Sequence, residues 1–300
     1  MNKYIGTLLG GCVGDILGSQ TEGMPSIIIR AKFGDLGVDK LPTSMLYTDD
    51  TEMTLVLARH LVLTTDIIDM GKLHNEYADI MQDKGYSKST RNILNLFRNK
   101  MRPFIPAGKS DHNGAVMRIC PLGLLNIPDN VLLHQVRAAI YYTHGDSEQA
   151  VATAFLHCKL INALVTGKIT GKHELFMHLI THSRTFPCIW PKINLVKFCL
   201  NASIESITDE ILGDRNAFQI KAIDAFCCAI YIFFTFYNEP LKAVCFAASL
   251  GGDTDTIGKL VGDLAGALHG TAWIPWKSYE GESELTSLGE AIYRKVLTIV

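Results

Sequence analysis

The chain has 300 residues, with 28 lysines and arginines against 30 aspartates and glutamates, for a formal net charge of −2. Apolar residues make up 48% and charged residues 19%. This composition excludes a disordered chain, because disorder requires low hydrophobicity and high net charge. The near-neutral balance also argues against a general binder of nucleic-acid phosphates, which needs a basic excess.

Three features of the sequence resemble those of secreted or membrane proteins, but a cytoplasmic protein explains all three better. The eight cysteines include no Cys-x-x-Cys pair and mostly stand among apolar residues, which favours buried free thiols over zinc or disulfides. The apolar N-terminus contains four regularly spaced glycines and Asp15, which favours a packed helix over a signal peptide. Residues 225–237 are too few to cross a bilayer, which takes about 20, so we predict a buried core helix without membrane association.

Helical periodicity runs through almost the whole chain. After the N-terminal helix, residues 26–30 are the only plausible short strand, with a loop or a helix as alternatives. A helix is predicted after Tyr47, and the most regular one begins near Asp255. The other predicted helices lie at about 130–142, 147–166, 172–182, 192–206, 216–237, 240–250 and 284–299. Because no linker or charge block divides the chain, we predict one all-α domain over residues 1–300, with about a dozen helices.

Two predicted helices carry glycines along one face. In the first helix these are Gly6, Gly10, Gly14 and Gly18, and in the helix near the C-terminus they are Gly258, Gly262 and Gly266. Each interior glycine costs about 1 kcal/mol of helix propensity relative to alanine, so the pattern needs a compensating gain. Without Cβ atoms another backbone can pack closely against the helix. We hypothesise that both helices run through the middle of the domain, near each other and near the active site.

Acidic residues gather at two predicted helix starts that are far apart in sequence. One is Tyr47-Thr48-Asp49-Asp50-Thr51, and the other is Gly251-Gly252-Asp253-Thr254-Asp255-Thr256. Capping of the free backbone N–H groups explains one or two acids per helix. It does not explain two neighbouring carboxylates at each start, because these groups repel each other unless a cation lies between them. Carboxylate and hydroxyl oxygens suit Mg²⁺ or Mn²⁺ better than zinc, and a two-metal site follows if the two starts meet in space.

Five motifs in order resemble the ADP-ribosylglycohydrolase family. They are Gly14-Asp15-x-x-Gly18 with Glu22, Thr48-Asp49-Asp50-Thr51, Asn113-Gly114-Ala115-Val116-Met117-Arg118, Thr143-His144 and Gly251-Gly252-Asp253-Thr254-Asp255-Thr256. The resemblance extends from about residue 3 to Ile274-Pro275 and so covers nearly the whole chain. It implies an all-helical orthogonal bundle with two Mg²⁺ or Mn²⁺ ions at the bottom of a cleft for ADP-ribose.

The resemblance also assigns roles to residues of this sequence. It implies that the metal ligands are Thr48, Asp49, Asp50, Asp253, Asp255 and Thr256. It places a catalytic glutamate, matched by Glu22, on a mobile loop after the first helix. The loop that contacts substrate diphosphate is matched by Asn113, Gly114, Met117 and Arg118, and the residue that contacts the adenosine-side ribose by His144. Where family members often have glycine before the Asn-Gly pair, this chain has His112, whose Cβ could alter the loop.

The expected activity is hydrolysis of the glycosidic bond between ADP-ribose and an arginine or serine side chain, or a related small conjugate. Catalysis would rest on Glu22, Asp50 and Asp255, with Glu22 either protonating the leaving group or positioning a metal-activated water. The expected partner is an ADP-ribosylated protein or small ADP-ribosyl conjugate, and the expected state is a monomer.

Two rival functions remain open, namely a two-metal phosphohydrolase of ADP-ribose or nucleotides and a non-catalytic protein that keeps the fold. Arg118 fits a phosphate contact or an internal ion pair equally well, and Asp15 is expected to act behind the ligands. Trp273 and Trp276 fit a lid over the cleft or a hydrophobic plug. A hydrolase dyad at His144 and Asp146 is disfavoured, because no Gly-x-Ser-x-Gly motif accompanies it.

Overall fold

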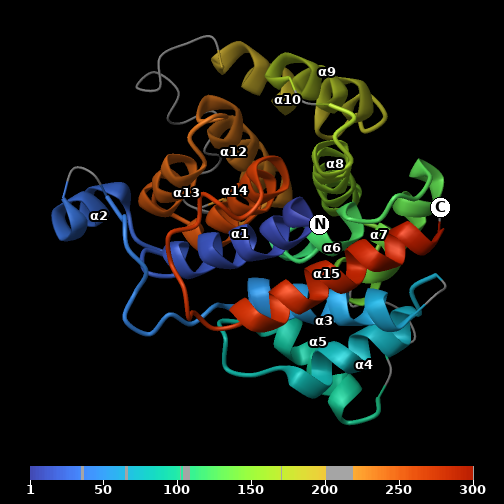
Figure 1. The fold of residues 1–300 in the computed structure, drawn as a ribbon. Helices are drawn as coiled ribbons and strands as arrows, with labels where there is room; N and C mark the ends of the chain where they lie inside the picture. Colours follow the sequence, from blue (N-terminus) through green and yellow to red (C-terminus); the bar gives the residue numbers. More distant parts are fainter. Residues whose placement is uncertain are drawn as a thin grey trace.

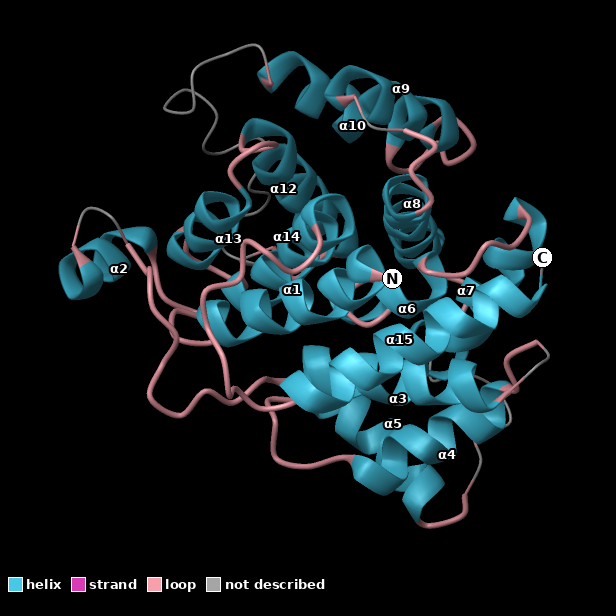
Figure 2. Cartoon of the chain, in the orientation of Figure 1, coloured by secondary structure: helices cyan, strands magenta, loops and turns pink. Residues whose placement is uncertain are grey.

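The computed structural model describes residues 1–34, 37–64, 67–101, 103, 109–169, 171–200 and 219–299, and every regular element among them is a helix (Figures 1 and 2). The all-α prediction is therefore confirmed. In chain order the helices are α1 (Asn2–Gly18), α2 (Ser26–Phe33), α3 (Asp49–Leu63), α4 (Met70–Ile80), α5 (Lys88–Arg98), η1 (Asn113–Ala115), α6 (Cys120–Gly123), α7 (Asp129–His144), α8 (Glu148–Val165), α9 (Lys172–Ser183), α10 (Trp190–Cys199), α12 (Ala222–Thr235), α13 (Pro240–Ser249), α14 (Thr254–His269) and α15 (Glu282–Ile299).

Helices α1 and α14 pack against each other in antiparallel orientation through their glycine faces. A Cβ atom placed on Gly10 would lie 2.3 Å from the carbonyl oxygen of Gly262, and one placed on Gly14 would lie 2.0 Å from that of Gly258. At the far end, a Cβ on Gly18 would lie 2.1 Å from the carbonyl oxygen of Thr254. Backbone therefore touches backbone along the whole contact, and the predicted pairing of the two helices is confirmed.

The α1–α14 pair lies in the middle of the molecule between two groups of helices (Figure 1). On one side α8, α12 and α13 pack against α14, with α9 and α10 beyond them. On the other side α15 packs against α1 and α3, with α4 and α5 on the outside. Helix α2 projects from the edge of the body, directly after the turn that follows α1 (Figure 2). This arrangement places the C-terminal end of α1 and the N-terminal end of α14 together.

The predicted core helix corresponds to α12, in which every residue from Ala225 to Phe234 is buried. It ends at Thr235, slightly earlier than expected. Six of the eight cysteines are also buried, as their apolar surroundings indicated. Within the residues described, no helix has the length and apolar character needed to span a membrane.

The short strand considered at residues 26–30 is wrong, because these residues begin α2. Pro25 stands at the N-cap position, and Ile29 packs inward while Ile27 and Ile28 point outward, so the isoleucines follow a helical period and not an alternating one. Sequence patterns also missed α4 and α5, two helices of 11 residues each, whose apolar faces are short. The predicted helices at 192–206 and 216–237 extend into residues outside those described.

Candidate metal centre and substrate site

Three chain segments meet at one end of the α1–α14 pair: the turn after α1, the start of α3 and the turn before α14. Hydrogen bonds join the two turns directly, from Gly23 N to Gly252 O at 2.8 Å and from Gly252 N to Met24 O at 3.1 Å. The hydroxyl of Thr254 donates to the carbonyl of Gly18 at 2.8 Å, where the glycine packing brings the two helix ends together. The close approach of the glycine faces therefore positions the acidic residues of these segments.

Glu22, Asp253 and Asp255 form a cluster in which one carboxylate oxygen of each lies within 4.8 Å of the others. Asp255 is buried, Asp253 is half-buried, and Glu22 is exposed at the outer edge. Such a group of oxygens could hold a metal ion. The structure thus brings the loop glutamate and the two aspartates at the start of α14 together.

The carboxylate of Asp15 fixes the start of α3 through hydrogen bonds. It accepts hydrogen bonds from the backbone N–H of Thr48 at 3.1 Å, the backbone N–H of Thr51 at 3.1 Å and the hydroxyl of Thr51 at 2.5 Å. These bonds satisfy N–H groups that a helix start leaves without an intrahelical partner. Asp15 is itself fully buried, and this position behind the α3 acids is the one expected for it.

Asp49 and Asp50 lie close enough to the other acids to repel them. Burial, together with the charges of Asp15 and Asp49, raises the pKa of Asp50 well above its ordinary value. Burial followed by the charge of Asp15 raises the pKa of Asp49 to about 8, and Asp253 contributes to both shifts. The pKa of Asp255 is likewise raised well above normal by burial and by the charges of Asp253 and Asp50. The acids at the starts of α3 and α14 therefore lie near enough to raise one another's pKa values.

The positive charge of Lys259, one turn after Asp255 on the same face of α14, partly offsets the raised pKa values of Asp15 and Asp50. Its ammonium group is fully buried and donates to both carboxylate oxygens of Asp263, at 2.7 and 2.9 Å. Within the described part of the chain, one carboxylate oxygen of Asp50 is buried without any hydrogen-bond partner. An unpaired buried oxygen beside several mutually repelling carboxylates fits a hard divalent cation, so the residues present suit a metal ion.

The loop that carries Asn113 reaches the same centre. The side-chain amide of Asn113 donates to the carboxylate of Asp253, so the loop and the acidic cluster are in direct contact. Gly114 faces the ring of His144, since a Cβ placed on it would lie 3.4 Å from the nearest ring carbon. The neighbouring His112 has φ −76° and ψ 161°, an extended conformation open to any residue, so its Cβ causes no strain in this loop.

Comparison with known proteins decides the family. A sequence profile described as ADP-ribosylglycohydrolase matches residues 1–298. The chain belongs to the ADP-ribosylglycohydrolase family. Its fold is shared with a solved structure titled "ADP-ribosylglycohydrolase-related protein complex", with a TM-score of 0.73, 25% identity and 98% of each chain covered. The membership makes the protein a hydrolase of the ADP-ribosylglycohydrolase type.

Curated relatives match over most of their length. The ADP-ribosylhydrolase ARH3 of Bos taurus is 25% identical, over 98% of this chain and 93% of the relative. The human protein of the same name is 24% identical over the same shares of both chains. An uncharacterised Escherichia coli protein, YegU, is 26% identical over 89% of this chain and 88% of its own length.

Two predicted substrate contacts of this ADP-ribosylglycohydrolase, Arg118 and His144, are buried side chains. Arg118 is fully buried and donates to the carbonyl of Gly114 at 2.8 Å and to the hydroxyl of Thr143 at 2.6 Å. The described residues contain no carboxylate in ion-pair contact with it. Arg118 thus supports the Asn113 loop from inside. His144 is 4% exposed, and burial and the charge of Arg118 lower its pKa well below normal, so its ring is neutral at physiological pH.

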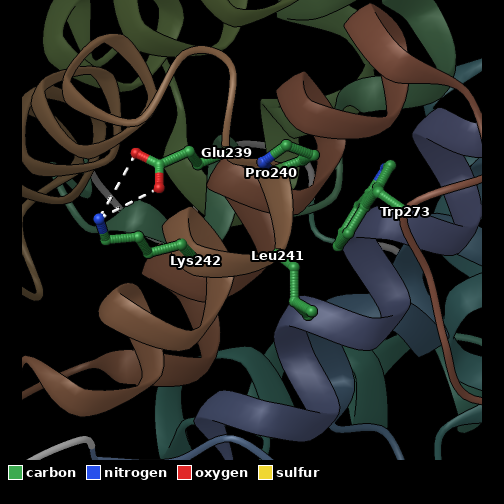
Figure 3. Close-up of a pocket in the computed structure, with 5 residues that line it drawn as sticks. All are labelled: Glu239, Pro240, Leu241, Lys242 and Trp273. Carbon is green, nitrogen blue, oxygen red and sulfur yellow. Dashed lines mark hydrogen bonds and ion pairs between the residues drawn. The ribbon is translucent and has the colours of Figure 1, made fainter.

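Trp273 packs against α1, away from the carboxylates. Its ring lies against Gly10, eight residues or about 12 Å along α1 from Gly18. With the first residues of α13 it lines a hollow of about 510 Å³ (Figure 3). The lining residues are Glu239, Pro240, Leu241, Lys242 and Trp273, and none of them belongs to the acidic cluster.

Proposed function

We propose that this ADP-ribosylglycohydrolase is a metal-dependent enzyme that removes ADP-ribose from an arginine or serine side chain or from a related small conjugate. The observation that carries the proposal is the cluster of Glu22, Asp253 and Asp255, with the α3 acids beside it and one oxygen of Asp50 buried without a partner. Names of relatives such as ADP-ribosylhydrolase ARH3 support the substrate class.

Two divalent cations, Mg²⁺ or Mn²⁺, would be held by Thr48, Asp49 and Asp50 from α3 and by Asp253, Asp255 and Thr256 from the start of α14. When bound, they would supply a Lewis acid for the ribose hydroxyls and lower the pKa of a coordinated water. Several carboxylates favour more than one cation, because burial and mutual repulsion raise their pKa values and bound positive charge stabilises their ionised forms.

The protein's own groups then divide the work. Glu22 lies at the exposed edge of the cluster, where a leaving side chain can reach it. Partial burial and the charges of Asp253 and Asp15 raise the pKa of Glu22, which favours a group that can hold a proton and deliver it to the leaving atom. Asp50 and Asp255 hold negative charge at the centre while cleavage of the glycosidic bond passes through an oxocarbenium-like transition state.

The Asn113 loop and His144 would bind the ADP part of the substrate. Asn113 already donates its backbone N–H to Ile220 and its side-chain amide to Asp253. The backbone N–H groups of Val116 and Met117 already donate to the carbonyl of Asn113, so the proposed diphosphate contact falls to the backbone of Gly114 and Ala115. We propose that the neutral ring of His144, which lies beside Gly114, contacts the adenosine-side ribose. We further propose that the chain acts as one domain and as a monomer in the cytoplasm.

Product analysis tests this function directly. Peptides carrying ADP-ribosyl-arginine or ADP-ribosyl-serine would be incubated with the protein and Mg²⁺, Mn²⁺ or chelator, and the products separated by mass spectrometry. We expect free ADP-ribose and an intact unmodified peptide, in the presence of metal only. AMP with a ribose phosphate left on the peptide would assign the protein to the phosphohydrolases instead, and unchanged peptides under all conditions would favour a non-catalytic protein.

A further inference from the structure

We propose that Gln219 is a positioning residue that ties the Asn113 loop to the Gly252–Asp253 turn, so that the substrate loop and the metal-binding carboxylates keep one geometry. This inference rests on the proposed function, since it assigns Gln219 to that metal centre. No sequence motif marks Gln219, and it lies 34 residues before Asp253.

Gln219 contacts both segments at once, through different groups. Its side-chain Oε1 accepts a hydrogen bond from the backbone N–H of Asp253 at 3.2 Å. Its backbone carbonyl accepts one from the side-chain amide of Asn113 at 3.2 Å. The same amide donates to the carboxylate of Asp253, which closes a ring of three residues around the proposed ligand. Asp253 is therefore held at both its backbone and its carboxylate.

The chain around Gln219 is fixed by short backbone pairing with the substrate loop. Asn113 N donates to Ile220 O at 2.8 Å, and Ala222 N donates to Asp111 O at 2.7 Å. An isolated antiparallel bridge joins His112 and Lys221 between them. Gln219 thus lies directly beside a short antiparallel backbone pairing between residues 111–113 and 220–222.

The side chain of Gln219 packs directly against Gly252. A Cβ placed on Gly252 would lie 1.9 Å from Oε1 of Gln219, so the side chain fills space that only glycine leaves open. Gln219 is 5% exposed and has φ 59°, a left-handed conformation that costs a non-glycine residue roughly 1 kcal/mol or more. Strain of this kind persists only where surrounding contacts maintain it, and here those contacts belong to the proposed metal centre.

Removing the hydrogen bond between Gln219 and Asp253 should weaken metal binding more than it destabilises the fold. Groups that orient metal ligands by hydrogen bonding typically change metal affinity 10- to 100-fold when they are removed. Without Oε1, the Asp253 N–H loses its acceptor and the turn before α14 is free to move relative to Asn113. The metal-free protein should show this as faster amide exchange in residues 251–256.

The test compares Gln219→Met with a matched control elsewhere in the fold. Gln135 on α7 is also buried, at 6% exposure, and its Oε1 also accepts one backbone N–H, from Ile68 at 2.7 Å. Gln135→Met therefore removes the same kind of bond far from the acidic cluster. Gln219→Glu keeps an acceptor oxygen in place and serves as the conservative rescue.

Mn²⁺ affinity would be measured by electron paramagnetic resonance, and amide exchange by mass spectrometry on the chelator-treated proteins. We expect Gln219→Met to weaken Mn²⁺ binding 10- to 100-fold and to deprotect residues 251–256, and Gln219→Glu to restore Mn²⁺ binding. Gln135→Met should leave both unchanged. Wild-type behaviour of Gln219→Met, or an equal loss in Gln135→Met, overturns the positioning role. Failure of the wild-type protein itself to bind Mn²⁺ would instead refute the proposed function, and the two failures are thus distinguishable.

Discussion

At the scale of single residues, Asp50 carries the strongest chemical signal for a bound cation. It is 2% exposed, and one of its oxygens has no hydrogen-bond partner among the described residues, although Asp15 beside it accepts several bonds. The difference separates a carboxylate that organises the protein from one that is left for a ligand. Asp15 and Asp50 both belong to motifs recognisable in the sequence, but only the structure shows that their hydrogen-bond partners differ.

Replacing Asp50 by asparagine is expected to stabilise the metal-free protein and to abolish metal binding. The substitution removes one buried charge from a group of carboxylates that repel each other, and it also removes a hard anionic ligand. Thermal unfolding with chelator should give a higher Tm than wild type, whereas Mg²⁺ should no longer raise it. A lower Tm with chelator would mean that Asp50 is held by an attractive partner.

Glu22→Gln should retain ADP-ribose binding and lose turnover by 10²-fold or more, because the amide cannot exchange a proton with the leaving group. Affinity by calorimetry and rate by product release would be measured on the same preparation. Full activity would remove Glu22 from the chemistry, and loss of metal binding would make it a ligand of the cluster that it shares with Asp253 and Asp255.

The stability of the metal-free protein should fall as pH rises from about 4 to about 8. The pKa of Asp49 is raised to about 8 in the folded state by burial and by Asp15, against about 4 when unfolded. The folded protein therefore binds more protons over this range, and its stability declines as they are lost. Chelator-treated Asp49→Asn should show a flatter Tm profile over the same range, and an unchanged slope would contradict the assignment.

At the scale of elements, the glycine faces of α1 and α14 could be predicted from sequence, because a costly residue repeated on one helix face implies a close contact. Sequence patterns left strand, loop and helix open for α2, where three isoleucines follow one another, and they missed α4 and α5, whose periodic signal is short. They also could not identify Gln219, because its partners are distant in sequence and its role depends on a backbone conformation that no residue pattern encodes.

Gly10→Leu should destabilise the protein by about 3 kcal/mol or more. A Cβ alone at Gly10 would lie 2.3 Å from the carbonyl oxygen of Gly262, so the two helices would have to separate. Ala31→Leu on the exposed side of α2 is the control, and it should change stability by less than about 0.5 kcal/mol. Urea unfolding of the three proteins gives the comparison, and equal midpoints would show that the close contact is not required.

At the scale of the whole molecule, the near-zero net charge conceals an uneven distribution. Five of the 30 acids, Glu22, Asp49, Asp50, Asp253 and Asp255, are assigned to one site, which two divalent cations would bring close to neutrality. The order of the motifs along the chain predicted that these segments belong together. Their contact in space follows from the fold, because the antiparallel packing of α1 and α14 brings the ends of these two helices together.

Calorimetric titration of ADP-ribose tests the central claim most directly, because it asks whether the acidic centre binds this ligand through a cation. Wild-type protein would be titrated with Mg²⁺ and with chelator, and Asp255→Ala with Mg²⁺. We predict saturable binding by the wild-type protein with Mg²⁺, and its loss both with chelator and in the variant. Equal affinity in all three titrations, or no binding by the folded wild-type protein with Mg²⁺, would contradict a metal-dependent ADP-ribose site at this end of the α1–α14 pair.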